Sequence, residues 1–546
     1  MNDQLEFLFK HGAAELHAGR FADAEATFRE MLRIDPGCPQ ARSGLGILKV
    51  REGKPTEAIG VYEEAMRSNP DWAEGHARLG ELRWSLGFRE AAVRHFRRLV
   101  QLKPEVVGAW NQLAGALYEL NELPEAETCS RKALQLDPAD IVAHYNLGLL
   151  LTRTRRFREA VGCYQEVLNQ VPNDIEAWFN LGAALIPLGE WDEAVVCYRR
   201  AHEISPADAD ICNNLAAAMF EHGDPVAAAD WYRQSLERCP ESPETSFRLS
   251  TVMLAQGKWS ETWDLYEQRL QIPGIQRPRL PMPEWRGEPL AGKRLLLLPE
   301  PGIGENLMMM RYADELARRG ASVDLLTQPG LLPLFRRSCE LARPIEKFAL
   351  DTAFDYQCQL LSLPRALKLT PETIHAPQSY LKAREIPRPE SFVAGKINIG
   401  ICWAGRVEDV NDHNRSLPNF YTLAPITSNR QVRLHSLQTG PRAAEAASFG
   451  LTDPTAKLRD LDEAAAYIQH LDLVITVDTE IAHLAGALGK PTWLLLPLMP
   501  DWTWYPYGET ATWYPSMRLF RQKAYRDWDE VIGRVAEALE EWGKTD

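Results

Sequence analysis

Three side chains that could handle a phosphate group lie at one predicted turn: Asp478, Thr479 and His483. An apolar run of strand length, 471–477, comes before the turn, and a second apolar run follows it. Thr479 is placed to cap a short helix between the two strands, and Gly489 is placed to end it. Backbone N–H groups and the positive end of a helix dipole suit a phosphate, so this turn predicts a nucleotide diphosphate site. The alternative is that the three side chains only cap and pack.

A second candidate for holding a diphosphate is Arg415. A predicted strand over 396–405 ends in a glycine turn, and Arg415 follows after a polar loop. The guanidinium fork can hold two phosphate oxygens at once. A salt bridge to Asp412 or Asp409 is the alternative role. Ser416 is placed to cap the next helix.

The motif D-T-x-x-x-H-L-A-G-A-L-G-K-P at 478–491 resembles the donor-diphosphate motif of bacterial heptosyltransferase-like GT-B glycosyltransferases, in the version fused to tetratricopeptide repeats. W-A-G at 403–405, R-S at 415–416 and the tail D-W-x-W, W-Y-P and R-L-F-R-Q match as well. The resemblance implies two Rossmann-like lobes with a sugar donor between them. It also implies that no metal is needed, because a helix dipole and basic residues can neutralise the leaving diphosphate.

The resemblance further implies roles for single residues. In that family the first glycine turn reads E-x-G-x-G-D, and its last acid deprotonates the acceptor hydroxyl; Glu305 stands there in this chain. Glutamate is one methylene longer than aspartate, so the geometry could be retuned or lost. The alternative is an acid that only favours the helix dipole. The family places donor contacts where Ser436 and Gln438 stand, and its last helix, here 527–542, crosses back onto the first lobe.

The first half of the chain is a repeat array. Prolines recur every 34 residues, which is the tetratricopeptide period, at positions 36, 70, 104, 138, 172, 206 and 240. Glycines recur in the first helix of most units, and an aromatic residue precedes most of the prolines by eight positions. Small residues where paired helices cross, and aromatics that fill the gaps, are typical of stacked helical hairpins. An eighth, degenerate unit over 242–270 is predicted to cap the array.

A row of asparagines is predicted on the concave face of this array. Asn146, Asn180 and Asn214 occupy the same position in three successive units. A carboxamide both donates and accepts hydrogen bonds, so such a row could grip the backbone of an extended peptide. The arrangement resembles the asparagine ladder of the O-linked N-acetylglucosamine transferases. Ordinary solvated surface asparagines are the alternative.

Composition narrows the choice of partners and compartment. The 61 basic and 75 acidic residues among 546 give a net charge of −14, and no basic block is present, so a nucleic acid partner is not expected. The nine cysteines form no C-x-x-C pair, so neither a zinc site nor a disulfide framework is expected. A secretory leader and a membrane span are not recognisable, which predicts a cytoplasmic protein.

The predicted fold is an α-solenoid, the tetratricopeptide superhelix, followed by an α/β GT-B domain. The array covers 1–270, a proline-rich linker 271–285, the acceptor-side lobe 286–392 and the nucleotide-sugar lobe 393–546. We expect a glycosyltransferase that moves a sugar from a nucleotide-activated donor to a hydroxyl of a protein held by the array, such as a bacterial surface or flagellar protein. The nucleotide sugar is a co-substrate, and no cofactor is expected. The alternatives are a non-catalytic scaffold with a degenerate transferase domain and a lipopolysaccharide-type glycan transferase.

Overall fold

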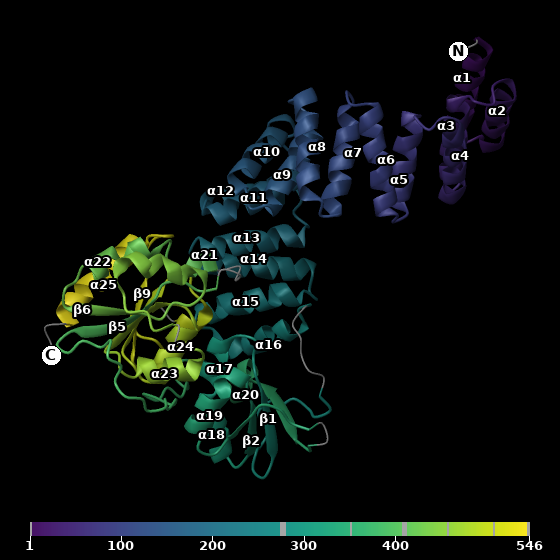
Figure 1. The fold of residues 1–546 in the computed structure, drawn as a ribbon. Helices are drawn as coiled ribbons and strands as arrows, with labels where there is room; N and C mark the ends of the chain where they lie inside the picture. The colour runs from purple at the N-terminus through teal and green to yellow at the C-terminus, as the bar shows by residue number, and fades with distance from the viewer. Residues whose placement is uncertain are drawn as a thin grey trace. The chain divides into compact units, whose positions relative to one another are not determined.

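The computed structural model describes residues 3–273, 280–349, 352–406, 412–455, 458–505 and 508–542. The chain divides into two compact units, Met1–Pro206 and Ala207–Asp546 (Figure 1). No helix in these described ranges is both long enough and apolar enough to cross a membrane.

The first unit consists of helices that pair in chain order, as the 34-residue period predicts. A Cβ atom on Gly46 would lie 2.2 Å from the Tyr62 ring, and one on Gly80 would lie 2.4 Å from the Phe96 ring. The small residues therefore admit the aromatic rings where the helices cross. The helices are α1 Asp3–His17, α2 Phe21–Ile34, α3 Pro39–Arg51, α4 Pro55–Ser68, α5 Ala73–Ser85, α6 Arg89–Leu102, α7 Val107–Glu119, α8 Leu123–Leu136, α9 Ile141–Arg153, α10 Phe157–Gln170, α11 Ile175–Leu185 and α12 Trp191–Ile204.

The second unit begins with the last repeats of the array. Helices α13 Ala209–Glu221 and α14 Pro225–Arg238 form a regular hairpin, and α15 Pro243–Ala255 opens the eighth one. The second helix of that hairpin is reduced to α16 Trp263–Tyr266, which lies between the 3-10 turns η2 Trp259–Glu261 and η3 Glu267–Gln271. Residues 243–271, called the terminal repeat below, are therefore the degenerate unit that the sequence predicts.

The first lobe is built on a parallel four-stranded sheet in the order β3-β2-β1-β4. Two short helices, α17 and α18, meet at Met310, where the Arg311 side chain donates to the carbonyl oxygen of Met308 at 2.7 Å. The end of the linker pairs with the sheet edge through a bridge between Glu284 and Gln357, and linker residues 274–279 lie outside the described residues. The elements are β1 Arg294–Leu298, α17 Ile303–Met309, α18 Arg311–Arg318, β2 Ser322–Leu326, α19 Leu332–Ser338, β3 Arg343–Ile345, β4 Tyr356–Gln359 and α20 Leu363–Leu367.

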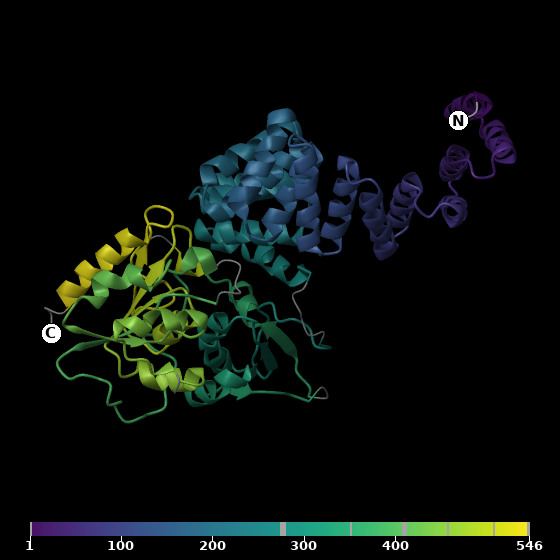
Figure 2. The same cartoon turned by 45° about the horizontal axis from the view of Figure 1, so that its top comes forward.

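The second lobe is built on a parallel five-stranded sheet in the order β6-β5-β7-β8-β9. Helices α22 and α25 lie on one face, and α23 and α24 lie on the other (Figures 1 and 2). All residues of β7 are buried, and alternate ones serve opposite cores: Ile475 packs in the core with α25, and Val474 in the core with α24. The elements are β5 Ile397–Cys402, α21 Asp412–Arg415, α22 Ala424–Thr427, β6 Val432–Ser436, α23 Leu461–Ile468, β7 Leu473–Val477, α24 Glu480–Ala487, β8 Thr492–Leu496, β9 Met517–Arg521 and α25 Trp528–Trp542.

The last helix, α25, differs from the expectation that it crosses back onto the first lobe. Its buried side chains, among them Trp528 and Val535, share a core with Phe420, Leu434 and Trp493 of the second lobe. An apolar stripe of helical period needs a matching apolar surface, and one face of the five-stranded sheet supplies it. The helix therefore completes the second lobe.

The terminal repeat packs against the transferase lobes through an aromatic cluster. The ring centroids of Trp259 and Trp263 each lie 5.7 Å from that of Trp502, and Trp259 lies 6.1 Å from Trp513. The indole N–H of Trp263 donates to the carbonyl oxygen of Leu369 at 2.9 Å. The unit predicted as a cap is thus part of the core of the second unit.

Candidate functional site

A cleft of 720 Å³, called the central cleft below, lies at the carboxyl ends of the strands of both sheets. Parallel sheets place their ligand sites at this edge. The structure brings five of the predicted site residues to its walls. They are Glu305 from the first lobe and Arg415, Asp478, Thr479 and His483 from the second.

Asp478 and Thr479 join β7 to α24 as the sequence predicts, but Thr479 does not cap the helix through its side chain. Its hydroxyl oxygen instead lies 3.2 Å from that of Thr476. At the other end of the helix, Gly489 adopts a left-handed φ of 74° and ends the helix as predicted. Burial raises the pKa of Asp478 to about 7, and the charge of Asp501 adds to the rise. Asp478 can therefore hold or release a proton near neutral pH.

His483 is buried and does not carry charge at neutral pH. Its Nδ1 lies 2.8 Å from the hydroxyl of Tyr514, and its ring centroid lies 5.0 Å from that of Trp504. Burial lowers the pKa of His483 to about 3, and the charge of Arg311 adds to this effect. A Cβ atom on Gly304 would lie 2.6 Å from the imidazole, so this glycine lets α17 approach the ring. A neutral imidazole can offer a phosphate a hydrogen bond but no positive charge.

Arg311 is a buried cation that the sequence analysis missed. Its side chain is held by the carbonyl oxygen of Trp513 at 2.7 Å and the hydroxyl of Tyr380 at 2.8 Å. Its guanidinium carbon lies 4.4 Å from the Tyr380 ring centroid and 4.9 Å from that of Tyr514. Arg311 thus ties the first lobe to the tail of the second and sits beside the tyrosine that bonds His483.

Glu305 lies in the first turn of α17, which begins after Gly302. A Cβ atom on Gly302 would lie 1.9 Å from a Glu305 carboxylate oxygen, so this carboxylate folds back over the start of its own helix. Burial raises the pKa of Glu305, and the charges of Asp501 and Glu300 add to the rise. A carboxylate with a raised pKa is a better proton acceptor at neutral pH.

The turn that carries Glu305 is held in place by Asn306. The Asn306 carboxamide accepts from the backbone N–H of Glu300 at 2.9 Å and donates to the carbonyl oxygens of Glu300 and Gly302 at 2.8 and 2.5 Å. Asn306 is itself 1% exposed. The backbone below Glu305 is therefore fixed by a buried side chain of the same helix.

Glu300 and Arg269 form a buried ionic group that sequence reasoning missed. Arg269 of the terminal repeat donates to Glu267 at 2.5 Å and to the Ser362 hydroxyl at 3.0 Å, and it lies 3.6 Å from Glu300. Burial raises the pKa of Glu300, and Arg269 opposes this rise. Both residues line the central cleft. The only sequence signal was the family's leading glutamate, which the turn at Glu300 retains.

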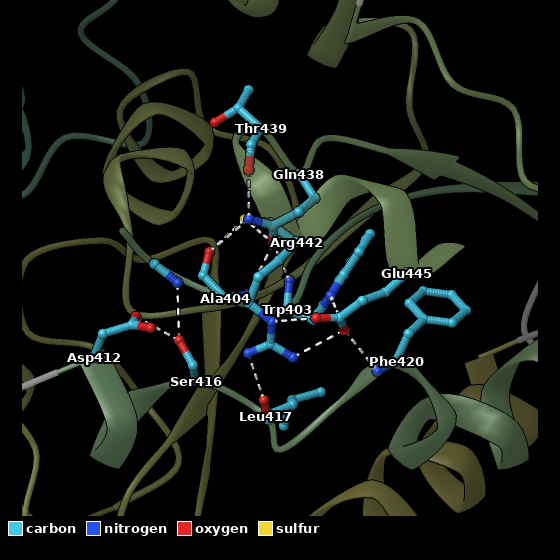
Figure 3. Close-up of polar contacts among 12 residues, drawn as sticks. Trp403, Ala404, Asp412, Ser416, Leu417, Phe420, Gln438, Thr439, Arg442 and Glu445 are labelled. Atoms are coloured by element: carbon cyan, nitrogen blue, oxygen red, sulfur yellow. Dashed lines mark hydrogen bonds and ion pairs between the residues drawn. The ribbon is translucent and has the colours of Figure 1, made fainter. Parts of the chain in front are cut away.

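Arg415 reaches the central cleft from α21. Its Nε lies 3.7 Å from a carboxylate oxygen of Asp412, so the predicted alternative partner is present, and the side chain remains 27% exposed. Asp409 lies outside the described residues. Ser416 does not cap a helix, because its hydroxyl donates to Asp412 at 2.5 Å and accepts from the backbone N–H of Gly405 at 2.9 Å (Figure 3). Ser416 thus fixes the turn after β5.

Gln438 also stabilises the turn after β5, so its carboxamide has little hydrogen-bonding capacity left for a ligand. Its oxygen accepts from the backbone N–H groups of Trp403 and Ala404 at 3.0 and 2.8 Å, and its nitrogen donates to the carbonyl oxygens of Ala404 and Thr439 at 3.0 Å (Figure 3). Ser436 lines neither the central cleft nor the second cavity described in the next paragraph. Its buried hydroxyl has no hydrogen-bond partner within the described ranges.

A second cavity of 360 Å³, called the side cavity, adjoins the central cleft. The two share the wall residues Ile303, Arg406, Thr479 and Glu480. The rest of the side cavity lies beyond the ends of β5 and β6, where Gln438 and Arg442 line it. Arg442 is itself held by Glu445, with nitrogen–oxygen distances of 2.5 and 2.9 Å (Figure 3).

The three predicted ladder asparagines are half-buried, and each makes a different contact. Asn146 donates to the carbonyl oxygen of Asn111 at 3.5 Å, and Asn180 donates to the Tyr145 hydroxyl at 3.1 Å; both lie in the first unit. Asn214, in the second unit, donates to the carbonyl oxygen of Asp210 at 2.9 Å. Each carboxamide oxygen faces no partner among these contacts, so it can still accept a hydrogen bond.

Two family models match the chain. Residues 4–241 match the cilia and flagella-associated protein 70 C-terminal domain, a tetratricopeptide model. Residues 427–516, which include β7, α24 and β8, match glycosyltransferase family 9 (heptosyltransferase). The chain carries a family 9 glycosyltransferase domain. This class consists of GT-B nucleotide-sugar transferases, so the predicted combination of a repeat array and a GT-B domain is confirmed.

Among individual proteins, Protein FlbA from Caulobacter vibrioides is 26% identical to this chain over 321 residues. The match covers 50% of this chain and 49% of FlbA, so the chain spans about half the length of the curated relative it matches. The solved structure of YrrB, described as a TPR protein with an unusual peptide-binding site, is 21% identical, with a TM-score of 0.31, over 34% of this chain and 95% of YrrB. That of MamA is 24% identical, with a TM-score of 0.29, over 31% of this chain and 92% of MamA.

Proposed function

We propose that this protein transfers a sugar from a nucleotide-activated donor to a hydroxyl group of a protein that its repeat array recruits. The observation that carries the proposal is the composition of the central cleft. A carboxylate of the first lobe, Glu305, and the phosphate-binding candidates of the second lobe line the same 720 Å³ space. Residues of the terminal repeat also line it, which connects the array to the site of chemistry.

The expected position of the donor follows from the cations of the central cleft and the volume of the side cavity. Arg415 and Arg406 are the cations of the cleft on the side of the second lobe, and Thr479 stands at the start of α24. The side cavity begins at Arg406 and Thr479, and its 360 Å³ is sufficient for a nucleoside. We infer that the phosphate groups lie at Arg415 and Thr479, with the nucleoside in the side cavity. Asp478 then faces the sugar, and neutral His483 supplies one hydrogen bond.

The reaction would begin at the acceptor hydroxyl. Glu305 takes its proton while the oxygen attacks the anomeric carbon of the sugar, and the bond from that carbon to the phosphate oxygen breaks. The leaving nucleotide keeps the electron pair of that bond, and Arg415 stabilises the negative charge. This assigns Glu305 to proton transfer and Arg415 to the leaving group.

The array would supply the acceptor. Asn146, Asn180 and Asn214 each retain an acceptor oxygen for the N–H groups of an extended peptide. Their replacement by alanine should lower transfer to a protein acceptor by about tenfold or more and leave donor hydrolysis by water unchanged. The matched control is Asn169→Ala, which removes an exposed asparagine from α10, the second helix of its repeat. Loss of transfer and hydrolysis together would indicate a structural role for the three asparagines.

The direct test of the function is donor turnover. The purified chain is incubated with a panel of nucleotide sugars, first alone and then with a lysate of cells that lack the gene, and proteins are examined by intact mass. Nucleotide release alone shows donor hydrolysis, and a mass increase of one sugar on a protein shows transfer. Turnover only on a glycolipid fraction would support the lipopolysaccharide-type alternative. No turnover of any donor would support the scaffold alternative.

The donor site is tested separately by ligand stabilisation. A nucleoside diphosphate that binds only the folded state should raise the melting temperature, and Arg415→Ala should remove most of that rise. Arg518, which is paired with Glu509 at 3.0 Å in the same lobe and lines neither cavity, provides the control variant Arg518→Ala. Equal shifts in the wild type and Arg415→Ala would exclude Arg415 from the donor site.

A further inference from the structure

The central cleft has a third wall, which the GT-B lobes do not supply. Phe247 and Thr251, one turn apart on α15, line the cleft together with Tyr266, Arg269 and Leu270. All five residues belong to the terminal repeat. Position 248, between the two α15 residues, is 34 residues after Asn214 and so continues the register of the asparagine row. Arg248 stands at this position and does not line the cleft, whereas Phe247 and Thr251 of the same helix do.

This third wall is mainly apolar. Phe247 is half-buried, and its ring centroid lies 5.4 Å from that of Tyr266. Leu270 lines the cleft beside these rings, and Leu361 of the first lobe, which is 9% exposed, extends the apolar lining. The one cation of the wall, Arg269, is already paired with Glu267. An uncharged, apolar group is therefore the natural occupant of this side of the cleft.

The third wall is fixed in position. Trp259 and Trp263 anchor the terminal repeat on Trp502, and Arg269 bonds Ser362 of the first lobe. A wall held to both lobes by buried aromatic and ionic contacts is a preorganised surface, and preorganisation favours selective binding.

We propose that the third wall is a specificity subsite for the acceptor, in which Phe247, Thr251 and Leu270 hold an apolar side chain within two residues of the accepting hydroxyl. The inference rests on the proposed transferase function and adds the chemistry of the preferred acceptor. Glu305 lines the same cleft, so a hydroxyl that reaches it places the neighbouring residues of an extended peptide against the wall. Contact with one phenyl ring is enough to change the KM of a peptide by about tenfold.

The experiment uses hexapeptides with a central serine or threonine, in which each other position is varied in turn. Such a peptide spans about 20 Å when extended. The full-length wild type should prefer leucine, methionine or phenylalanine at one position within two residues of the hydroxyl, and mass spectrometry measures this preference. Phe247→Ala should raise the KM of the preferred peptide about tenfold and abolish the preference, while donor hydrolysis stays at the wild-type rate. Phe247→Leu should restore most of the apolar preference.

Phe179→Ala is the matched control. Phe179 occupies the same position two repeats earlier, and its ring centroid lies 5.7 Å from that of Tyr198, whereas the Phe247 centroid lies 5.4 Å from that of Tyr266. Phe179 does not line the cleft, so its loss should leave hexapeptide kinetics unchanged.

Two outcomes would contradict the subsite and leave the transferase function standing. Either the wild type modifies peptides without an apolar preference, or Phe247→Ala keeps that preference. Loss of donor hydrolysis in Phe247→Ala and Phe247→Leu alike would also overturn the subsite, in favour of a structural role. Wild type that modifies no peptide and no protein would overturn both.

Discussion

At the scale of single residues, the central cleft is defined by carboxyl groups that hold protons unusually tightly. The pKa values of Glu305 and Asp478 are both raised, first by burial and then by neighbouring acids, and Arg415 opposes both shifts. Two acids with raised pKa values beside an arginine are typical of a site that moves a proton next to an anion. The chemistry of each acid can be tested by changes that keep its shape.

Glu305→Gln should lower transfer by roughly 10²- to 10⁴-fold, because the amide cannot accept the acceptor proton. Donor affinity, measured by nucleotide-dependent melting, should stay near the wild-type value. Glu305→Asp should keep part of the activity if the pocket adjusts to the shorter acid. The control is Glu340→Gln, which alters an acid of the same lobe that lines neither cavity and is paired with Lys382 at 2.8 Å. Transfer by Glu305→Gln at the wild-type rate would show that the base is a different residue.

Asp478 should make the second unit less stable as the pH rises. Its pKa is near 4 in an unfolded chain and about 7 in the fold, so the folded state binds the proton more tightly. The stabilisation is complete below pH 4 and is lost as the pH rises through 7. Asp478→Asn stays neutral, so its free energy of unfolding relative to wild type should rise by about 4 kcal/mol from pH 4 to pH 8, since the two pKa values differ by about three units and each unit corresponds to about 1.4 kcal/mol. Parallel stability curves from urea titrations at these pH values would contradict this.

At the scale of elements, the hairpin of α5 and α6 contains two histidines in contact, His76 and His95, whose ring centroids lie 5.2 Å apart. Arg83 donates to His95 Nε2, so the His95 proton is on Nδ1, which lies 3.0 Å from His76 Nδ1. His76 then carries its proton on Nε2 and donates to the carbonyl oxygen of Pro70 at 2.9 Å. This chain of hydrogen bonds requires both rings to be neutral. Burial lowers the pKa of His95 to about 4 and also lowers that of His76.

This hairpin should therefore loosen in acid. The folded state binds the His95 proton less tightly than the unfolded chain, so the stabilisation is present above about pH 6.5 and is lost as the pH falls through 4. Hydrogen exchange of residues 73–102, corrected for intrinsic rates, should be faster at pH 4.5 than at pH 7, and His95→Gln should remove most of the difference.

His144 provides the control for the histidine pair. It stands at the same repeat position as His76 and lies 2.9 Å from the Pro138 carbonyl oxygen, but no second histidine is among its described contacts. His144→Gln should leave the exchange of residues 73–102 unchanged at both pH values. Equal pH dependence in wild type and His95→Gln would mean that the histidine pair does not set the stability of the hairpin.

At the scale of the whole molecule, the compact units do not coincide with the predicted boundary between array and transferase. The second unit begins at Ala207, so it includes α13 to α16 as well as both lobes. The aromatic cluster of Trp259, Trp263, Trp502 and Trp513 explains this division, because it buries the terminal repeat against the lobes. Array and transferase are thus joined by a shared core.

A fragment of residues 207–546 should therefore fold and hydrolyse the donor. A fragment of residues 272–546 should aggregate, because it exposes Trp502 and Trp513.

In the full chain, Trp259→Ala should destabilise the second unit by about 3–5 kcal/mol, as removal of a buried tryptophan generally does. Thermal melts and size-exclusion chromatography measure both outcomes. A monodisperse, cooperatively melting 272–546 fragment would show that the terminal repeat is dispensable for folding.

The sequence by itself determined the elements. The 34-residue period predicted the helical hairpins, and the run from 471 to 489 predicted β7, its turn, α24 and the glycine that ends it. Such patterns are local, because the residues that set a helix or strand lie within a few positions of one another. The same locality allowed Asp478 and Thr479 to be placed at a helix start without any knowledge of their neighbours.

Only the tertiary structure decided how side chains are used. Arg311 finds partners 64 and 202 residues away, and the hydroxyl of Ser416 and the carboxamide of Gln438 are engaged by the turn after β5. The packing of α25 on the second lobe and the third wall of the cleft depend equally on contacts between distant segments. A polar side chain can bind a ligand or satisfy a buried backbone group, and which one it does depends on the groups that the fold brings within hydrogen-bond distance.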